Sequence, residues 1–368
     1  MNTVKIAMIG VGAISGIYLK NITSLFQEIE LIGVCDLVRE RAEKAQTEYS
    51  VPKLYETMYD AFADPEVDII LNLTRPYEHF AVTKAALEAG KHVYSEKPLG
   101  ATFEEGLELA RIAEEKELFL GGAPDTFLGA GLQTCRRLID DGFLGEPIGA
   151  AAFMICRGHE RWHPDPEFYY KFGGGPMMDM GPYYVTALIN LLGQVNGVTG
   201  TTKKSFPQRV ITSQPKYGTV IDVDVPTFVT GILDFDSGAT GTLFTTFDVH
   251  YKQQARFEIY GSEGTLLVPD PNTFGGPVFL LRPEDGEYRQ IPLLFDYQEN
   301  SRALGLADMA KAIQTGRSAR ASHQQTLHVL EILTAFERSS NEKKYHPIQT
   351  SYQRPCPMEK GGLHGIIL

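Results

Sequence analysis

The sequence predicts an α/β fold in two domains: a doubly wound parallel sheet over residues 1–124, then an α+β domain over residues 125–368. Three observations lead to this prediction. The 368 residues exceed one typical domain of about 150 residues. Short β-rich runs alternate with helical patterns through the first third of the chain. After Pro124 this alternation stops, and residues 198–292 are rich in Val, Thr, Phe and Gly.

In the first third, each predicted strand is a short apolar run bounded by Gly, Pro or charged residues. Such runs are typical of parallel strands buried on both faces of a sheet. Strands are predicted at 4–9, 31–35, 67–73, 92–95 and 118–120. Ile14, Tyr18, Ile22 and Leu25 repeat at the spacing of one helix face, and residues 39–49, 79–89 and 103–116 also have helical composition.

The remainder of the chain predicts an antiparallel sheet with helices around it. Turn signals such as Asp236-Ser-Gly238 separate short runs of β-branched and aromatic residues. The strands are expected at 227–233, 240–247, 256–260 and 278–281, and helices at 128–141, 182–192, 301–315 and 322–338. Because no flexible linker separates the two domains, we expect them to pack together with an active-site cleft between them.

The composition is that of an ordinary globular protein, 43% hydrophobic and 22% charged. A net charge of −12, scattered along the chain, disfavours binding to phosphate backbones, so no nucleic-acid partner is expected. No cleavage site follows the N-terminus and no apolar run reaches membrane-spanning length, so no membrane partner is expected. The four cysteines form no C-x-x-C pair, which fits a protein of the reducing cytoplasm.

A glycine-rich turn directly follows the first predicted strand. In Gly10-Val-Gly12-Ala13-Ile14-Ser15-Gly16, the first glycine permits a tight turn and the second lets the backbone approach a pyrophosphate. The helix that begins there presents free N–H groups to that anion. Ser15 replaces the third glycine of the usual pattern, so looser packing of the helix is expected. The turn, with Ala13 and Ile14, predicts a dinucleotide site in a Rossmann domain.

Asp36 ends the second strand, where a carboxylate can bind ribose hydroxyls. A carboxylate there repels the 2′-phosphate of NADP, so NAD is the favoured cofactor and NADP the less favoured one. Arg39 and Arg41 leave an alternative open, because either could pair with that phosphate instead of being a solvated helix charge.

Two further segments carry residue types suited to chemistry. Glu96-Lys97-Pro98 places a lysine at the carboxyl edge of the parallel sheet, where ligands bind, although a surface lysine is the alternative. In the segment from Gly173 to Tyr184, Asp179 and Tyr183 are four residues apart, so a helical turn would direct both to one ligand. A packed core tyrosine is the alternative there.

His159-Glu160-Arg-Trp162-His163 matches the H-E-x-x-H zinc pattern. That chemistry requires a helix, but Gly158 precedes the motif and Pro164 follows it, so we expect no helix and no metal site. The loop is better suited to binding a sugar-like polyol through the faces and edges of Trp162 and His163, with a packed loop core as the alternative.

Together these segments resemble the glucose-fructose oxidoreductase, inositol dehydrogenase and MocA family of NAD(P)-dependent dehydrogenases. The landmarks are the Gly10/Gly12 turn, Thr74-Arg-Pro76 with His79, Glu96-Lys97-Pro98, the glycine segment to Gly181, and Glu258 to Thr265. The resemblance implies a large, mostly antiparallel open sheet in the second domain, whose open face forms a homodimer or homotetramer. It also implies a catalytic Lys97, and that Thr74, Pro76, His79 and Glu96 lie around the nicotinamide.

In many members of this family a histidine stands four residues after the aspartate, where this chain has Tyr183. Members that resemble glucose-fructose oxidoreductase use a tyrosine there as the acid/base. The hypothesis is therefore that Tyr183 and Lys97 act on a secondary alcohol or ketone of a sugar, inositol or glycoside, with Asp179 orienting it. Asp125, Trp162, His163 and Tyr184 are the candidate substrate contacts. Glycoside cleavage through transient oxidation, and a non-catalytic NAD-binding redox sensor, are the alternatives.

Overall fold

The computed structural model describes residues 3–251, 256–360 and 364–367. The first part of the chain forms a six-stranded sheet in the order β3-β2-β1-β4-β5-β6, with every pair parallel. Its elements are β1 (Val4–Ile9), α1 (Ser15–Ser24), β2 (Ile29–Cys35), α2 (Arg39–Tyr49), β3 (Lys53–Leu54), α3 (Met58–Ala63), β4 (Ile69–Asn72), α4 (His79–Glu88), β5 (His92–Ser95), α5 (Phe103–Glu115) and β6 (Leu120–Gly122).

This sheet confirms the predicted Rossmann domain. Ile6, Met8 and Ile69 on its central strands are fully buried, as a sheet covered on both faces requires. The strand order reverses between β1 and β4. Ligands of such sheets bind outside the carboxyl ends of the strands at this reversal, where the Gly10 turn and the loop after β4 both lie.

The second sheet has nine strands in the order β16-β15-β14-β13-β7-β12-β11-β8-β17. Only β7 and β12 pair in parallel, so the mostly antiparallel sheet is confirmed. Its strands are β7 (Pro147–Ile155), β8 (Val195–Lys203), β11 (Phe228–Phe235), β12 (Thr240–Thr246), β13 (Phe257–Gly261), β14 (Thr265–Leu267), β15 (Val278–Leu281), β16 (Arg289–Ile291) and β17 (His346–Pro347). A separate hairpin consists of β9 (Gln208–Val210) and β10 (Val220–Asp222).

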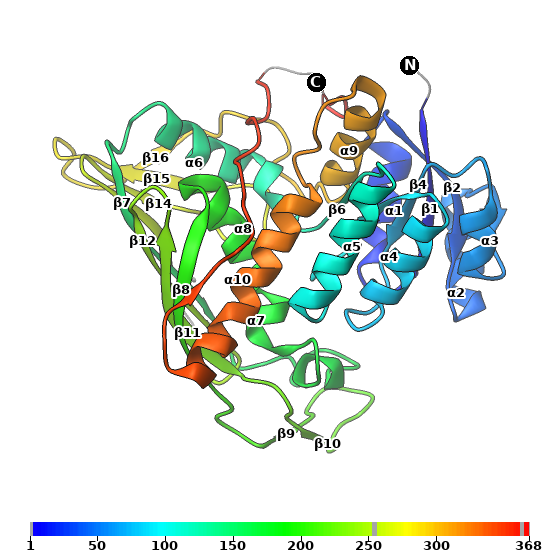
Figure 1. Cartoon of the computed structure of the whole chain (residues 1–368), viewed down its shortest axis with the longest axis horizontal. Coiled ribbons are helices and arrows are strands. Elements are labelled where there is room, and N and C mark those ends of the chain that lie inside the picture. Colours follow the sequence, from blue (N-terminus) through cyan, green and yellow to red (C-terminus); the bar gives the residue numbers. More distant parts are fainter. Residues whose placement is uncertain (1–2, 252–255, 361–363, 368) are drawn as a thin grey trace.

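Helices α8 and α10 lie between this sheet and the first domain, and α6 packs against α8 and β15 near the other end of the sheet (Figure 1). The remaining elements are η1 (Thr126–Leu128), α6 (Ala130–Asp140), η2 (Glu167–Tyr170), α7 (Gly175–Asp179), α8 (Gly181–Leu192), α9 (Leu304–Thr315) and α10 (His323–Glu342). Every residue of α8 is buried. The other side of the sheet carries the half-buried rings of Phe153, Phe228 and Phe244. The ring centroid of Phe244 lies 4.8 Å from that of Phe228 and 5.9 Å from that of Phe153.

Several elements of the structure are not predicted from the sequence. Strand β7 lies in the middle of the second sheet, yet its run Gly149-Ala-Ala-Ala152 has low β-propensity. The short β3 and α3, the β9–β10 hairpin and the two-residue β17 are also missed. Predicted helices start or end a few residues away from the observed ones, as with α9, which begins at Leu304 rather than at residue 301.

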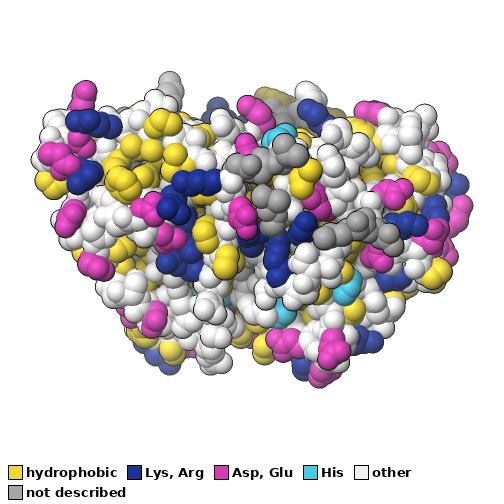
Figure 2. All heavy atoms as spheres, turned by 90° about the horizontal axis from the view of Figure 1, so that it is seen from above, with side chains coloured by type: hydrophobic (Ala, Val, Ile, Leu, Met, Phe, Trp, Pro, Cys, Tyr) yellow, Lys and Arg dark blue, Asp and Glu magenta, His cyan; other side chains and the backbone are white. Residues whose placement is uncertain are grey.

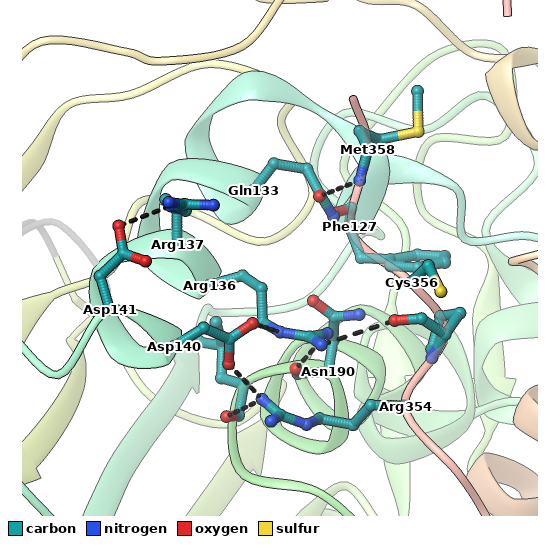
Figure 3. A network of polar contacts seen from close by, with 12 residues as sticks. Phe127, Gln133, Arg136, Arg137, Asp140, Asp141, Asn190, Arg354, Cys356 and Met358 are labelled. Atoms are coloured by element: carbon teal, nitrogen blue, oxygen red, sulfur yellow. Dashed lines mark hydrogen bonds and ion pairs between the residues drawn. The ribbon is translucent and has the colours of Figure 1, made fainter. Parts of the chain in front are cut away.

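The last part of the chain ties the two domains together. α10 packs against β8 of the second sheet and also against β6 and α5 of the first. Beyond β17 the chain runs alongside α6 and α8, where the Arg354 guanidinium binds Asp140 and the carbonyl of Leu191 (Figure 3). The N–H of Met358 donates to Gln133 in the same network. Further on, the N–H of Ile367 donates to Glu28 of the Rossmann domain.

Acidic and basic side chains are interspersed over the face shown in Figure 2, in agreement with the scattered charges of the sequence. Within the described part of the chain, none of the helices has the length and apolar character needed to cross a bilayer.

Candidate functional site

The glycine turn between β1 and α1 is built for close approach of a ligand. Gly10 has a φ of +95°, and a Cβ there would lie 2.8 Å from the backbone of Leu73, so only glycine fits. Around Gly12, by contrast, nothing lies within 4 Å of an added Cβ. Ala13 and Ile14 are exposed beside it, and no side chain caps the N-terminus of α1. The uncapped N–H groups fit an anion such as a pyrophosphate.

Ser15 is buried, and its hydroxyl donates to the carbonyl of Gly12 at 2.7 Å. Ser15, which replaces the third glycine of the usual pattern, therefore stabilises the turn from its buried side.

Asp36 is tied to the same turn. Its Oδ2 accepts from the N–H of Val11 at 2.6 Å, and its Oδ1 accepts from the N–H of Val38 at 2.7 Å. The carboxylate keeps further lone pairs for ribose hydroxyls. Arg39, the suggested phosphate partner, is instead held by Glu43 and Glu56. The residues present thus fit the adenosine half of a dinucleotide.

The loop after β4 is fixed by buried polar groups. The Asn72 side chain accepts from the Thr74 hydroxyl at 2.7 Å and donates to the hydroxyl of Thr83. Both ring nitrogens of the buried His79 contact carbonyls, at 2.7 Å from Pro98 and 3.0 Å from Thr74. His79 therefore joins the Thr74–Pro76 loop to the loop of Lys97, and acts on the site through the backbone rather than from its surface.

Lys97 contacts Asp179 across the two domains. Its Nζ donates to Oδ1 of Asp179 at 2.9 Å and to the carbonyl oxygen of Asp179 at 2.7 Å, with both side chains 16% exposed. Burial acts to lower the pKa of Lys97, but the negative groups around it, Asp179 above all, hold that pKa above its usual value. Burial acts to raise the pKa of Asp179, yet Lys97 and His159 hold it at about 2. The pair is ionised at neutral pH.

Tyr183 completes this cluster from the first turn of α8. Its ring centroid lies 5.2 Å from Nζ of Lys97, and its hydroxyl oxygen lies 3.5 Å from a guanidinium nitrogen of Arg302. Burial raises the pKa of Tyr183, while Lys97 and Arg302 act to lower it. Asp179 ends α7 and Tyr183 lies in α8, so the two residues belong to consecutive short helices rather than to one helix. Both nevertheless contact Lys97.

A second carboxylate network lies beside Lys97. Glu96 accepts from the Tyr18 hydroxyl at 2.8 Å and from the N–H of Lys97 at 3.0 Å. Asp125 is 1% exposed and accepts from the N–H of Gly305 at 3.1 Å. Burial raises the pKa of Asp125 to about 6, although the Gly305 N–H and Arg302 act to lower it. This packing leaves Asp125 without a free surface for a substrate, contrary to the expectation from sequence.

The zinc-like motif is not helical, as predicted; residues 159–162 form a bend and a turn after Gly158. Its first histidine belongs to the site, because Nε2 of His159 lies 3.1 Å from Oδ2 of Asp179. Glu160 points elsewhere and pairs with the buried Arg209 at 3.1 Å. Across the described residues, no group of three or more His, Cys, Asp or Glu side chains is arranged to hold a metal ion.

The other candidate substrate contacts differ in accessibility. Trp162 is 63% exposed and its ring lies edge-on to His159 and His163. Their loop is joined to the Thr74–Pro76 loop by an ion pair of 2.9 Å between Arg75 and Asp165. Tyr184, by contrast, is 2% exposed and stacks on Phe257 of the second sheet. A ring packed on a sheet offers no face to a ligand, so Tyr184 is a core residue and its suggested substrate role has no support.

Two side chains of this cluster are not among the predicted site residues. His159 contacts Asp179 from 20 residues away, and the H-E-x-x-H pattern and the polar, aromatic loop around it are the signals that mark it in the sequence. Arg302 contacts Tyr183 from 119 residues away, and nothing local in the sequence marks it.

The comparisons with known proteins agree with the geometry. Residues 4–121 match the model described as the oxidoreductase family with an NAD-binding Rossmann fold. Residues 132–267 match the model of the GFO/IDH/MocA C-terminal domain. The chain belongs to this family. Members of the GFO/IDH/MocA family are NAD(P)-dependent dehydrogenases that act on CH–OH groups, so this chain is an NAD(P)-dependent oxidoreductase.

Two curated relatives and one solved structure illustrate the family. The chain is 32% identical to a D-xylose dehydrogenase of Paenarthrobacter nicotinovorans over 47% of its own length and 45% of that protein. It is 26% identical to a scyllo-inositol 2-dehydrogenase (NAD(+)) of Bacillus subtilis, over 72% of this chain and 73% of the other. A levoglucosan dehydrogenase in complex with NADH shares the fold at a TM-score of 0.83 and 19% identity, over 95% and 100% of the two chains.

The Lys97–Asp179 pair makes a prediction about stability. Asp179→Asn should lower the free energy of unfolding by about 3 kcal/mol at pH 7, because it leaves a buried ammonium without its anion. The cost should be much smaller when Lys97→Met is already present. Chemical denaturation of the four proteins of this double-mutant cycle measures the coupling.

The same pair fixes the sign of the pH dependence. Since the folded-state pKa of Asp179 is lowered to about 2, its contribution is present above pH 4 and is lost as the pH falls toward 2. In the double-mutant cycle, an equal loss of unfolding free energy on Asp179→Asn with Lys97 and with Met at position 97 would contradict a stabilising ion pair.

Proposed function

We propose that this chain transfers a hydride between a nicotinamide dinucleotide, NAD in preference to NADP, and a secondary alcohol or ketone of a sugar, inositol or glycoside. The observation that carries the proposal is the convergence of Lys97, Asp179 and Tyr183, which come from both domains, at one point beside the strand reversal of the Rossmann sheet. The polyol names of the D-xylose and scyllo-inositol relatives support the substrate class.

In this proposal Tyr183 moves the proton. During oxidation its phenolate oxygen accepts the proton of the substrate hydroxyl, and during reduction the phenol returns it. Lys97 has two of its three N–H donors on Asp179, so one remains for the substrate oxygen. Asp179 holds the ammonium in place and His159 holds Asp179. Both act as positioning residues.

The cofactor would be held by the Gly10–Ile14 turn and Asp36 on its adenosine and phosphate side. Thr74, Pro76, Glu96 and Lys97 would lie toward its nicotinamide, with His79 supporting their loops. When bound, the nicotinamide supplies the hydride acceptor or donor. Trp162 and His163 are the substrate contacts that we retain, because their loop reaches the Thr74–Pro76 loop through Asp165 and Arg75.

The first test is a panel of polyols and glycosides, with NADH or NADPH absorbance as the readout. Lys97→Met and Tyr183→Phe should each lower kcat by at least about 100-fold, since each removes a group of the proton-transfer step. NADH binding, measured by fluorescence titration, should change little. Normal turnover by Lys97→Met contradicts the assignment. Glycoside cleavage without accumulation of NADH would instead identify the transient-oxidation reaction, and tight NADH binding with no turnover would identify a sensor.

The cofactor preference has its own test. Asp36→Ala should raise the KM for NAD by about tenfold, because a charged hydrogen-bond acceptor for the ribose is lost, and should improve the ratio of NADP to NAD activity. Arg39→Gln is the matched control. It should leave NADP activity unchanged, because Arg39 is held by Glu43 and Glu56. Wild-type activity that favours NADP would contradict the proposal.

We also infer that a second copy of the chain covers the open face of the nine-stranded sheet, as a homodimer or as half of a homotetramer. The half-buried rings of Phe153, Phe228 and Phe244 form an apolar cluster there, and apolar side chains left partly uncovered together on one face are typical of an interface.

The oligomer prediction is tested by sedimentation. Phe244→Glu should shift the protein toward monomer, because the new charge would be buried in the interface. Leu107→Glu, at a 50% exposed position on α5, is the control and should leave the mass unchanged. A wild-type monomer at micromolar concentration would exclude the interface.

A further inference from the structure

Arg302 is a cation of the site that neither the motifs nor the comparisons assign. Its guanidinium donates to Oδ1 of Asn300 at 2.8 Å and to Oδ1 of Asn272 at 2.7 Å, and its Nη2 lies 3.5 Å from the Tyr183 hydroxyl. All of these acceptors are neutral. Within residues 3–251, 256–360 and 364–367, no carboxylate forms an ion pair with it. Its positive charge is therefore not cancelled by direct contact.

The backbone around Arg302 is held in an unusual conformation. Two non-glycine residues with positive φ bracket it, Tyr297 at 66° and Ala303 at 82°. Such residues persist only where the surroundings enforce them, and they gather at functional sites. Here the enforcing group comes from the Rossmann domain, because the Asn21 side chain of α1 donates to the carbonyls of Asn300 and Arg302 at 2.9 and 2.8 Å. The loop is therefore fixed by the domain opposite its own.

We propose that Arg302 is a second cationic group of the catalytic centre, which donates to the Tyr183 oxygen and stabilises its phenolate form. The inference rests on the proposed role of Tyr183 as acid/base. Lys97 lies over the face of the ring and is paired with Asp179, whereas Arg302 approaches the oxygen itself. The distance is long for a hydrogen bond, as is common before a substrate is bound.

Arg302 neither gains nor loses a proton in the proposed reaction. A guanidinium stays charged throughout the working pH range, so the only transfer is between the substrate hydroxyl and the Tyr183 oxygen. Arg302 changes the position of that equilibrium. The other charged or titratable groups facing Tyr183 are Lys97, Glu96, Tyr94 and Tyr169. Glu96 opposes the phenolate and the two cations favour it.

The sign of the pH effect follows. Oxidation requires the phenolate, so kcat/KM should rise with pH until Tyr183 is ionised. Removal of a neighbouring positive charge should move that rise to higher pH by about 1 to 2 units. Arg302→Met should therefore shift the pH profile of kcat/KM to higher pH. Arg302→Lys keeps the positive charge and should give a profile close to that of the wild type. Arg282→Met, at a partly exposed arginine, is the control and should cause no shift.

A second readout needs no turnover. The absorbance of tyrosinate during an alkaline titration, taken as the difference between each protein and its Tyr183→Phe counterpart, follows the Tyr183 hydroxyl alone. The same upward shift is expected in Arg302→Met. This readout separates the two proposals, because a wild type that is inactive on every polyol contradicts the proposed function while the titration still tests Arg302.

Two results would overturn the inference. If Arg302→Met lowers kcat equally at every pH and shifts neither the kcat/KM profile nor the tyrosinate titration, the role of Arg302 is to maintain the loop structure. A raised substrate KM with an unchanged profile assigns it to substrate binding. Should Arg302→Met fail to fold, Asn21→Ala releases the two loop carbonyls and is expected to shift the titration in the same direction, and its failure to do so would equally count against the proposal.

Discussion

The two domains meet at a buried ion pair, and the arrangement of the site depends on it. Lys97 follows β5 of the parallel sheet, whereas Asp179 ends α7, a short helix of the second domain. Burial disfavours the charged form of each group, and the partner from the other domain favours it. Any movement that separated the domains here would leave two unpaired charges. α10, Asn21 and the chain beyond β17 hold the domains together at other points.

The parts of this molecule that sequence reasoning predicts well are those that local chemistry decides. The Rossmann strands are apolar runs between breakers, and Gly10 must be glycine because its backbone is left-handed and lies against Leu73. Strand β7 shows the opposite case. Three alanines after Gly149 have no preference for a strand, yet β12 and β13 pair with them from both sides. Tertiary pairing decides that element, and a single sequence does not display it.

The same division applies to the site. Lys97, Asp179 and Tyr183 are marked by neighbouring prolines and glycines and by a family resemblance, so their convergence could be predicted. His159 and Arg302 could not, because each arrives through a long loop whose path depends on other residues. Tyr184 is the opposite case, a residue that sequence reasoning assigns to the site and that the structure places in the core. It sits beside Tyr183 in sequence, but successive helix positions point about 100° apart, and its ring packs into the core.

The acid/base role proposed for Tyr183 requires more from its surroundings than the same role would require of a histidine. A free phenol has a pKa of about 10 and a free imidazole about 6.5, and burial moves the pKa of Tyr183 further up. Two cations act against this, but they are not equivalent. Asp179 accepts directly from Lys97, so the field that reaches the phenol is that of a pair. The hydrogen bonds of Arg302 to the described residues go only to neutral oxygens, and the buried Asp125 acts on it without forming an ion pair. Both cations act to lower the pKa of Tyr183, Lys97 from beside the ring and Arg302 from beside the hydroxyl oxygen. The proposed acid/base role of Tyr183 therefore depends on both, and the pairing of Lys97 with Asp179 is what distinguishes them.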